Sequence, residues 1–188
     1  MKQVVFLVRH AKFRNPRHIY YGRLPGFPLS KAGEKQAAWL GKRFATKGIQ
    51  AVFSSPLLRT KQTAGAIAEK TRASLFFDRR LIERGLAVQG KTQAQARALK
   101  KQGVSVWEEP PKRVASRMKR FLRKIFKRKL ERVVVVSHED PISFLVLSLE
   151  RKPFDRALFP PERASVTRLA FENKRLKSRA YFAPQHFK

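Results

Sequence analysis

The chain has 188 residues, and its 43% hydrophobic content is enough to bury the core of one ordinary domain. Its 43 Lys and Arg outnumber 13 Asp and Glu. The formal net charge of +30 is either a general trait of the surface or favours loose contact with nucleic acid, acidic lipid headgroups or polyphosphates. Because there is no cysteine, a disulfide framework, a thiolate metal site and a cysteine nucleophile are excluded.

The sequence predicts a protein without a membrane span. The first apolar run, 4–8, is too short for a signal-peptide core and is interrupted by Arg9. We expect a soluble protein, and the lack of cysteine is compatible with the reducing cytoplasm.

Strand and helix signals alternate along the chain. The β-branched and aromatic run 4–8 predicts a strand covered on both faces. A loop rich in Pro, Gly and Tyr follows over 15–30, and then a helix from the cap Ser30 to about Ala45. The remaining signals predict strands at 51–54, 75–77, 133–136, 167–171 and 178–182. They predict helices at 56–70, 92–102 and 112–129 and a further helix that starts at Pro141. The last residues are predicted to form a frayed tail.

In two of these helices the sequence indicates which residues form the apolar face. In 56–70 one buried face can hold Leu58, Ala64, Ile67 and Ala68. The helix at 112–129 is amphipathic, because its apolar residues recur at three and four positions between Lys and Arg: Val114, Met118, Phe121, Leu122 and Ile125.

The order of elements favours a single domain over 1–188, a three-layer α/β/α sandwich with a mostly parallel central sheet. We expect the helix at 92–102 to pack over the functional site, within a small cap around 83–111. In such sheets, ligands bind beyond the carboxyl ends of the strands.

Two histidines directly follow the two clearest strands. If these strands are parallel neighbours, His10 and His138 meet at one edge of the sheet. A phosphoryl group needs fixed cations around it, and Arg9 and Arg59 are the candidates for that task. The alternative is that both histidines are satisfied polar residues at strand ends and that the arginines are surface cations.

Five segments occur in the order that the histidine phosphatase superfamily shows. They are FLVRHAKFRN, GRLPGFPLSKAGEKQA, FSSPLLRTKQTA, LIERG and VVVVSHEDPI, and they spread over about three quarters of the chain. Together they resemble this superfamily, which includes phosphoglycerate mutases and many small phosphatases. The resemblance implies a phosphoglycerate mutase-like fold and a phosphatase of the small branch.

The resemblance also implies roles for single residues. Neutral His10 would attack phosphorus and become phosphohistidine, while Arg9, Arg59 and His138 hold the phosphoryl oxygens. Glu83 would protonate the leaving alcohol and then deprotonate water, which requires a pKa raised by burial.

Other residues leave alternatives open. Glu83 stands between two arginines, and its other interpretation is a surface ion pair with Arg80 or Arg84. Asn15 matches a position that often contacts the phosphate, but Asn before Pro is also an ordinary turn pair.

The sequence departs from the family pattern after both histidines. Ala11 replaces the more common Gly, which is a mild change. Glu139 and Asp140 stand where Gly is frequent, and their carboxylates would repel a phosphate dianion unless they point away.

We expect no metal and no cofactor, and the partner to be a phosphorylated small molecule or a phosphoprotein. Selectivity should come from the loop at 15–30 and the cap, where the aromatic candidates are Tyr20, Tyr21, Phe27 and Trp107. The substrate and the oligomeric state are not predicted.

Two other functions compete with hydrolysis of a phosphomonoester, and one further role of the basic surface is compatible with it. A mutase generally needs a larger cap, which keeps its phosphohistidine dry. The basic surface can steer anionic substrates toward the site. Alternatively, a weakly active member of the fold binds nucleic acid or another polyanion along the helix that carries Arg117, Lys119, Arg120, Arg123, Lys124, Lys127 and Arg128.

Overall fold

The computed structural model describes residues 1–184, so the end of the predicted tail, 185–188, lies outside the described residues. Six strands form one sheet: β1 (Lys2–Arg9), β2 (Ala51–Ser54), β3 (Ser74–Phe77), β4 (Arg132–Ser137), β5 (Val166–Glu172) and β6 (Arg175–Phe182). Their order is β3-β2-β4-β1-β5-β6. The strands β3, β2, β4 and β1 are parallel, β5 is antiparallel to β1, and β6 is antiparallel to β5.

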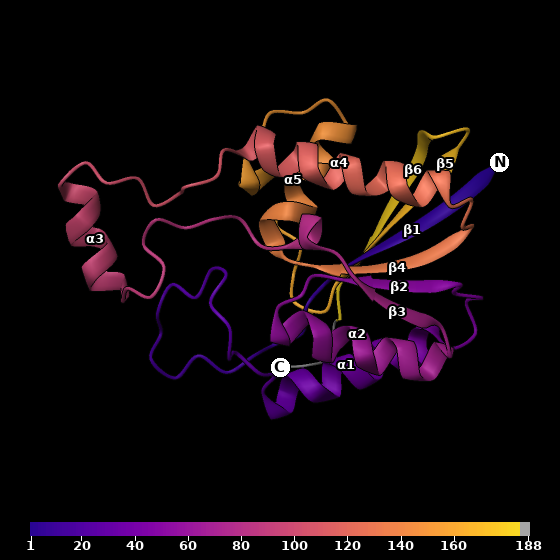
Figure 1. Ribbon diagram of the computed structural model, residues 1–188, viewed down its shortest axis with the longest axis horizontal. Helices are drawn as coiled ribbons and strands as arrows, with labels where there is room; N and C mark the ends of the chain where they lie inside the picture. The colour runs from indigo at the N-terminus through magenta and orange to yellow at the C-terminus, as the bar shows by residue number, and fades with distance from the viewer. Residues whose placement is uncertain (185–188) are drawn as a thin grey trace.

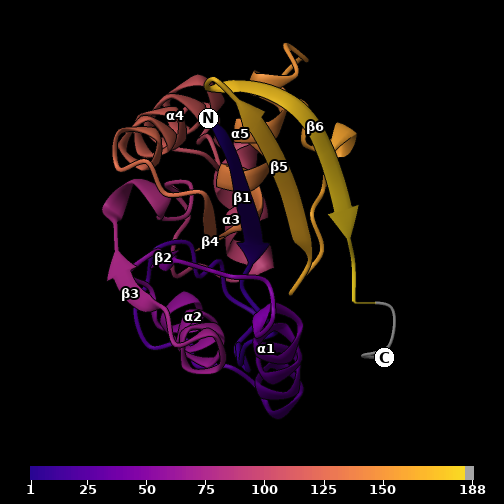
Figure 2. The same cartoon turned by 90° about the vertical axis from the view of Figure 1, so that its right-hand side faces the viewer.

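Helices cover both faces of this sheet (Figures 1 and 2). One face carries α1 (Lys31–Phe44) and α2 (Leu58–Thr71), and the other carries α4 (Pro111–Lys127) and α5 (Glu139–Leu149). Short 3₁₀ turns, η1 (Arg79–Leu81) and η2 (Arg156–Leu158), lie in the connections. The predicted three-layer sandwich with a mostly parallel sheet is confirmed.

The middle residues of the central strands β1 and β4 are all apolar because each face of the sheet has its own core. In β1, Val5 and Leu7 pack in the cluster with α4 and α5, whereas Val8 packs in the cluster with α1 and α2. Val133 and Val134 of β4 divide in the same way, and all five valines and leucines are fully buried. The two cores fix β1 and β4 in the middle of the domain.

The first turn of α1 presses directly on the backbone that follows β1. Ser30 caps the helix by accepting a hydrogen bond from the Gly33 N–H. A Cβ on Gly33 would lie 1.7 Å from the backbone oxygen of Lys12. The helix can approach this closely only because residue 33 has no side chain.

We expect Gly33→Ala to lower the free energy of unfolding by about 3 kcal/mol, because the obstructing atom is backbone and cannot rotate away. Gly65→Ala is the matched control: it also lies in a helix, and its added Cβ meets nothing within 4 Å. There alanine should stabilise by up to about 1 kcal/mol through helix propensity. Urea unfolding of both variants measures the difference, and equal responses would contradict the close approach.

Two predicted helix starts are wrong by two residues. α2 begins at Leu58 instead of at 56, and α5 begins at Glu139 instead of at Pro141, with His138 as its N-cap residue. Proline is tolerated inside the first turn, so Pro141 does not have to begin the helix. The predicted face of α2 is also wrong at one position, because Leu58 is 37% exposed whereas Arg59 is fully buried.

The helix α3 (Gln93–Lys101) lies away from the sheet instead of packing over the histidines (Figure 1). Two long connecting segments, 82–92 and 102–110, join it to the rest of the domain and are called its arms below. The arms are joined at their base by a bridge between Leu86 and Trp107, where the Ala87 N–H donates to the Val106 carbonyl at 3.1 Å. A second bridge joins Ile19 to Thr92. The loop at 15–30 and the arms of α3 therefore support each other.

No helix within the described residues combines the length and the apolar character that a membrane span requires.

Candidate active site

His10 and His138 meet at the carboxyl edge of the sheet. Their strands β1 and β4 are parallel neighbours, with Arg9 opposite Ser137, and the His10 N–H donates to the Ser137 carbonyl at 3.0 Å. The two imidazole rings lie edge to face with their centroids 5.2 Å apart. Both side chains are buried, so the sheet brings the pair together as the sequence predicts.

The hydrogen bonds of His10 fix which ring nitrogen is free. Nδ1 lies 2.9 Å from the Ala11 carbonyl oxygen, which can only accept, so Nδ1 carries the proton. Nε2 is then unprotonated, and it is buried without a hydrogen-bond partner among residues 1–184. Burial, with the charges of Arg59 and Arg163, holds the pKa of His10 well below its usual value. His10 is therefore neutral and has a free lone pair on Nε2.

His138 connects the other groups of the site. Its Nε2 lies 2.8 Å from the Ser55 hydroxyl, and its Nδ1 lies 3.5 Å from Arg59 Nη2 and 3.8 Å from Glu83 Oε2. Burial and the nearby Arg59 charge keep the pKa of His138 well below its usual value. His138 thus joins a guanidinium and a carboxyl group at one point.

Arg59 is a fully buried cation on the first turn of α2. Its Nη2 donates to the Gly22 carbonyl at 2.8 Å, and its Cζ lies 4.8 Å from the ring centroid of Tyr21 and 5.5 Å from that of Phe13. Burial lowers the pKa of Arg59 to about 10, opposed by the Glu83 carboxylate, so the side chain stays charged at neutral pH. The two aromatic rings hold this charge beside the histidines.

Arg9 is also close to the site, but a carboxylate already neutralises part of its charge. Arg9 Nη2 lies 2.6 Å from Glu139 Oε2, and Nη1 donates to the Pro161 carbonyl at 2.7 Å. Its Nε is buried and finds no hydrogen-bond partner within the described part of the chain. Burial lowers the pKa of Arg9, and the Glu139 carboxylate opposes that shift.

Glu83 reaches the site from the segment after η1. Oε1 accepts the Arg84 N–H at 2.8 Å, which leaves Oε2 on the side of His138. The flanking guanidinium groups turn elsewhere, that of Arg80 to Asp78 and that of Arg84 to Asp140. Burial, reinforced by the Asp140 charge, raises the pKa of Glu83 to about 7. Glu83 can therefore both give and take a proton near neutral pH.

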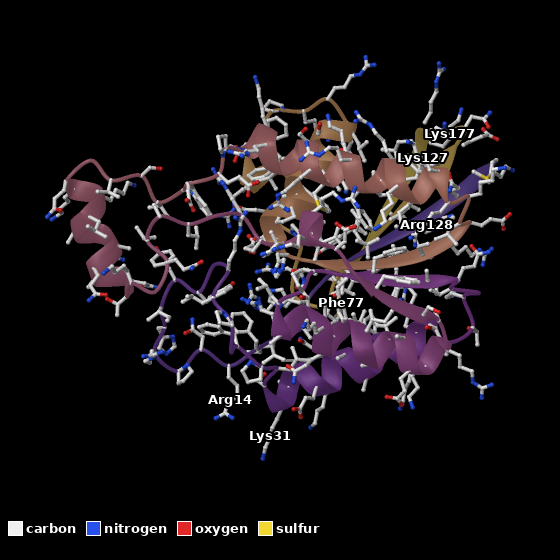
Figure 3. The ribbon with its side chains drawn as sticks, in the orientation of Figure 1. Arg14, Lys31, Phe77, Lys127, Arg128 and Lys177 are labelled. Atoms are coloured by element: carbon white, nitrogen blue, oxygen red, sulfur yellow. The ribbon has the colours of Figure 1, made fainter. Side chains whose placement is uncertain are left out.

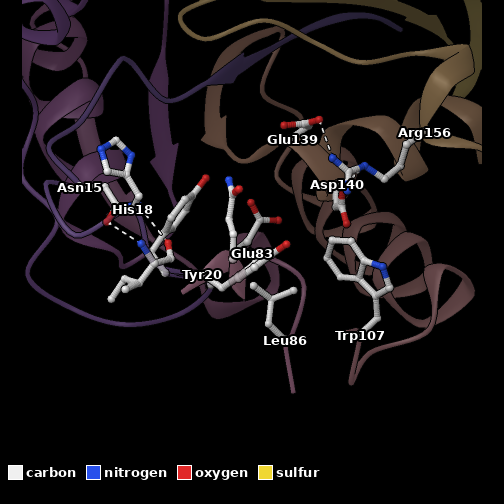
Figure 4. Close-up of a pocket in the computed structure, with 13 residues that line it drawn as sticks. Asn15, His18, Tyr20, Glu83, Leu86, Trp107, Glu139, Asp140 and Arg156 are labelled. Atoms are coloured by element: carbon white, nitrogen blue, oxygen red, sulfur yellow. Dashed lines mark hydrogen bonds and ion pairs between the residues drawn. The ribbon is translucent and has the colours of Figure 1, made fainter. Parts of the chain in front are cut away.

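A pocket of about 330 Å³ opens beside Glu83 (Figure 4). Asn15, His18 and Tyr20 lie on one side of it, and Trp107 and Arg156 on the other. The aromatic candidates Tyr20, Tyr21 and Trp107 line this pocket, whereas Phe27 packs against the rings of Phe13 and Tyr21.

The two carboxylates after His138 do not point away from the site, because both line the same pocket. Cations neutralise them instead: Arg156 lies 2.8 Å from Glu139 and 2.9 Å from Asp140. Asp140 also lies 3.5 Å from Arg84. Pairing with arginines therefore reduces the negative charge that these carboxylates present to the pocket.

Asn15 lines the pocket, but its amide group binds its own loop. Its Nδ2 donates to the Ile19 carbonyl at 2.9 Å, and its Oδ1 accepts the Ile19 N–H at 3.3 Å. The structure thus shows the turn role that the Asn-Pro pair also predicts.

The basic helix α4 is less uniform than its sequence indicates. Arg117 is 7% exposed and lies 2.9 Å from Glu109, so its prediction as a polyanion-binding residue of this helix is wrong. Lys124 is half-buried and pairs with Asp78 at 2.9 Å. Exposed cations remain at the end of α4, at Lys127 and at the C-cap residue Arg128 (Figure 3).

Sequence reasoning missed Arg163 and Arg156, which come from the segment between α5 and β5. Arg163 affects the pKa of His10, and Arg156 lines the pocket. No motif marks either residue in the sequence. Knowing that β5 runs antiparallel beside β1 would place the residues before β5 next to His10.

The described residues contain no group of three His, Cys, Asp or Glu side chains that is arranged to hold a metal ion. The groups assembled around His10 are imidazoles, guanidiniums and the Glu83 carboxyl group, with the arginine-paired carboxylates of Glu139 and Asp140 nearby. They are suited to nucleophilic attack on an anionic centre, with proton transfer by Glu83.

Comparisons with known proteins agree with this geometry. Residues 5–183 match the model of the histidine phosphatase superfamily, branch 1. The uncharacterized protein Rv0525 of Mycobacterium tuberculosis is 35% identical over 196 residues, covering 96% of each chain. The probable phosphoglycerate mutase GpmB of Salmonella arizonae is 36% identical over 100 residues, covering 53% of this chain and 46% of its own.

Two solved structures show the same fold. YhfR of Bacillus stearothermophilus has a TM-score of 0.84 and 22% identity, covering 93% of this chain and 94% of its own. The mycobacterial glucosyl-3-phosphoglycerate phosphatase Rv2419c has a TM-score of 0.79 and 24% identity, covering 90% of this chain and 91% of its own.

Proposed function

The chain belongs to the histidine phosphatase superfamily, and we propose that it is a phosphomonoester hydrolase that works through a phosphohistidine on His10. The observation that carries this proposal is the free Nε2 of His10. The Ala11 carbonyl holds the proton on Nδ1, and Nε2 is left buried among cations without an acceptor or donor in the described chain.

The proposed reaction has two steps. In the first, His10 Nε2 attacks phosphorus, the ester P–O bond breaks, and Glu83 gives its proton to the leaving oxygen. In the second, water gives a proton to Glu83 and attacks phosphorus, and the N–P bond breaks. Arg9, Arg59 and His138 would stabilise the negative charge on the phosphoryl oxygens during both steps.

Hydrolysis is favoured over mutase chemistry by the shape of the cap. A mutase must keep its phosphohistidine dry and hold the phosphorylated product for re-attack. Here α3 stands away from the sheet edge, and the segment between η1 and α4 leaves an open pocket beside Glu83. In this proposal water reaches the intermediate, and the substrate is a phosphorylated small molecule in the cytoplasm.

The test uses wild-type protein and a ³²P-labelled phosphomonoester in the presence of a metal chelator. We expect turnover and a protein-bound label that survives alkali but is lost in acid, as an N–P bond requires, with the label on the peptide that contains His10. A label that resists acid would contradict the proposal. So would turnover that occurs only when the chelator is left out.

Contact with nucleic acid or another polyanion is a second, compatible proposal. It is supported by exposed cations at the end of α4, Lys127 and the C-cap residue Arg128 (Figure 3). Removing His10 should leave such binding intact, which separates the two functions.

A further inference from the structure

The segment before β5 packs against the backbone at the carboxyl end of β1. The Arg9 N–H donates to the Ser165 carbonyl at 3.2 Å, and the Ala164 N–H donates to the Arg9 carbonyl at 3.0 Å. Ala164 is fully buried and has a φ of +57°, a left-handed conformation that a non-glycine residue keeps only where its surroundings enforce it. The backbone of Arg163 is therefore fixed next to His10.

The Arg163 side chain shares its contacts with the known groups of the site. Its Cζ lies 4.5 Å from the ring centroid of Phe13, and the same ring lies 5.4 Å from the His10 ring. Its Nη2 lies 3.5 Å from the Tyr21 hydroxyl, and both aromatic rings also contact Arg59. Two rings thus hold two guanidinium groups around one imidazole.

Arg163 also has an unused donor. Its Nη1 is buried without a hydrogen-bond partner anywhere in residues 1–184, as are Nε of Arg9, Nε of Arg59 and Nε2 of His10. Leaving a buried donor of a charged group unsatisfied is costly, and an anion with several oxygens satisfies such donors together. After burial and Arg59, Arg163 lowers the pKa of His10 more than Arg9 does, which agrees with its position.

We propose that Arg163 is a third guanidinium that binds the phosphoryl oxygens of the substrate. The inference rests on the proposed function, because it assumes that a phosphate monoester binds at His10. Arg163 lies over the Phe13 ring that contacts His10 and does not line the pocket beside Glu83, although Tyr21 lines both that pocket and the recess of Arg163. We therefore assign Arg163 to the transferred group and not to the leaving alcohol.

This assignment also accounts for the pairing of Arg9 with Glu139. The Glu139 carboxylate, 2.6 Å from Arg9, removes part of the positive charge that a phosphate dianion would meet there. Arg163 supplies a further positive charge close to His10.

The experiment measures binding of inorganic phosphate by titration calorimetry, which needs no turnover. Arg163→Ala should weaken phosphate binding about tenfold or more, since it removes charge-assisted hydrogen bonds. Arg163→Lys should fall between this variant and wild type, because it keeps the charge but loses the planar fork.

Arg14→Ala is the matched control. Arg14 lines the same recess, but its side chain is exposed and points away from the fold (Figure 3). It removes the same charge from the +30 chain, and phosphate binding should stay within about twofold of wild type at fixed salt.

The proposal is overturned if Arg163→Ala binds phosphate as well as Arg14→Ala does. If Arg163→Ala does not fold, Arg163→Lys and Arg163→Gln are compared with Arg14→Ala by the same criterion. A wild-type protein that binds phosphate through Arg163 but forms no phosphohistidine would refute the proposed function and leave this inference standing.

Discussion

Replacing His10 by alanine is expected to abolish turnover of p-nitrophenyl phosphate, with a loss of at least about 10⁴-fold in kcat. The reason is that the free Nε2 of His10 is the nucleophile in the proposed reaction. His138 cannot replace it, because its Nε2 is already engaged with the Ser55 hydroxyl at 2.8 Å. The measurement is nitrophenolate release by both proteins in the presence of a chelator.

The control for this variant is binding of inorganic phosphate. His10→Ala keeps the guanidinium groups around the site, so it should still bind phosphate, which shows that the site is folded. A variant that binds phosphate and retains more than about a tenth of the wild-type rate would rule out His10 as the nucleophile.

Replacing Glu83 by glutamine is expected to lower kcat/KM most for substrates whose leaving oxygen must be protonated. For an alkyl phosphate such as glycerol 2-phosphate, kcat/KM should fall roughly 10²–10⁴-fold, the usual contribution of a general acid. For p-nitrophenyl phosphate the fall in kcat/KM should be much smaller, because nitrophenolate leaves without a proton. Loss of the base for the second step should instead produce a burst of nitrophenolate and a labelled enzyme.

The pH profile gives a second test of Glu83, whose pKa burial raises to about 7. The acid form protonates the leaving oxygen, so kcat/KM for the alkyl phosphate should fall as pH rises through about 7. This alkaline limb should be absent from Glu83→Gln, which cannot titrate. Burial holds the pKa of His10 well below its usual value, so His10 should not add an acid limb near neutrality.

The matched control is Glu108→Gln, which removes a carboxylate from the same segment where the side chain is exposed. It should keep the leaving-group dependence and the pH profile of the wild type. If Glu83→Gln and Glu108→Gln lose equal activity on both substrates, Glu83 is not the general acid.

The sheet was predictable because its strands are recognisable one by one. The apolar strand before His10 and the one before His138 were each clear in the sequence, and the register of β1 with β4 shows that they are neighbours. Helix starts were less predictable, because proline fits both at the start and within a first turn. The buried face of α2 was assigned from hydrophobicity, which favours Leu58 and cannot identify Arg59 as the buried residue.

The candidate site was predictable where a motif or a strand end marks it. His10, His138, Arg59 and Glu83 lie together in the structure, although their roles stay predictions. Arg163 was not predictable, because an arginine in an irregular segment has no signature among the many others of a chain with 43 Lys and Arg. Its position depends on the pairing of β5 with β1, which only the fold supplies.

The bridge between Leu86 and Trp107 has a consequence for how this enzyme can diversify. It holds the two ends of the α3 segment together, so the residues between them form a closed insertion. Exchanging the part of that insertion beyond Thr92, which pairs with the loop at 15–30, would change the pocket wall that contains Gln93 without disturbing β1, β4 or the groups on them. Substrate preference can then change during evolution, or by grafting, while the phosphoryl chemistry is inherited unchanged.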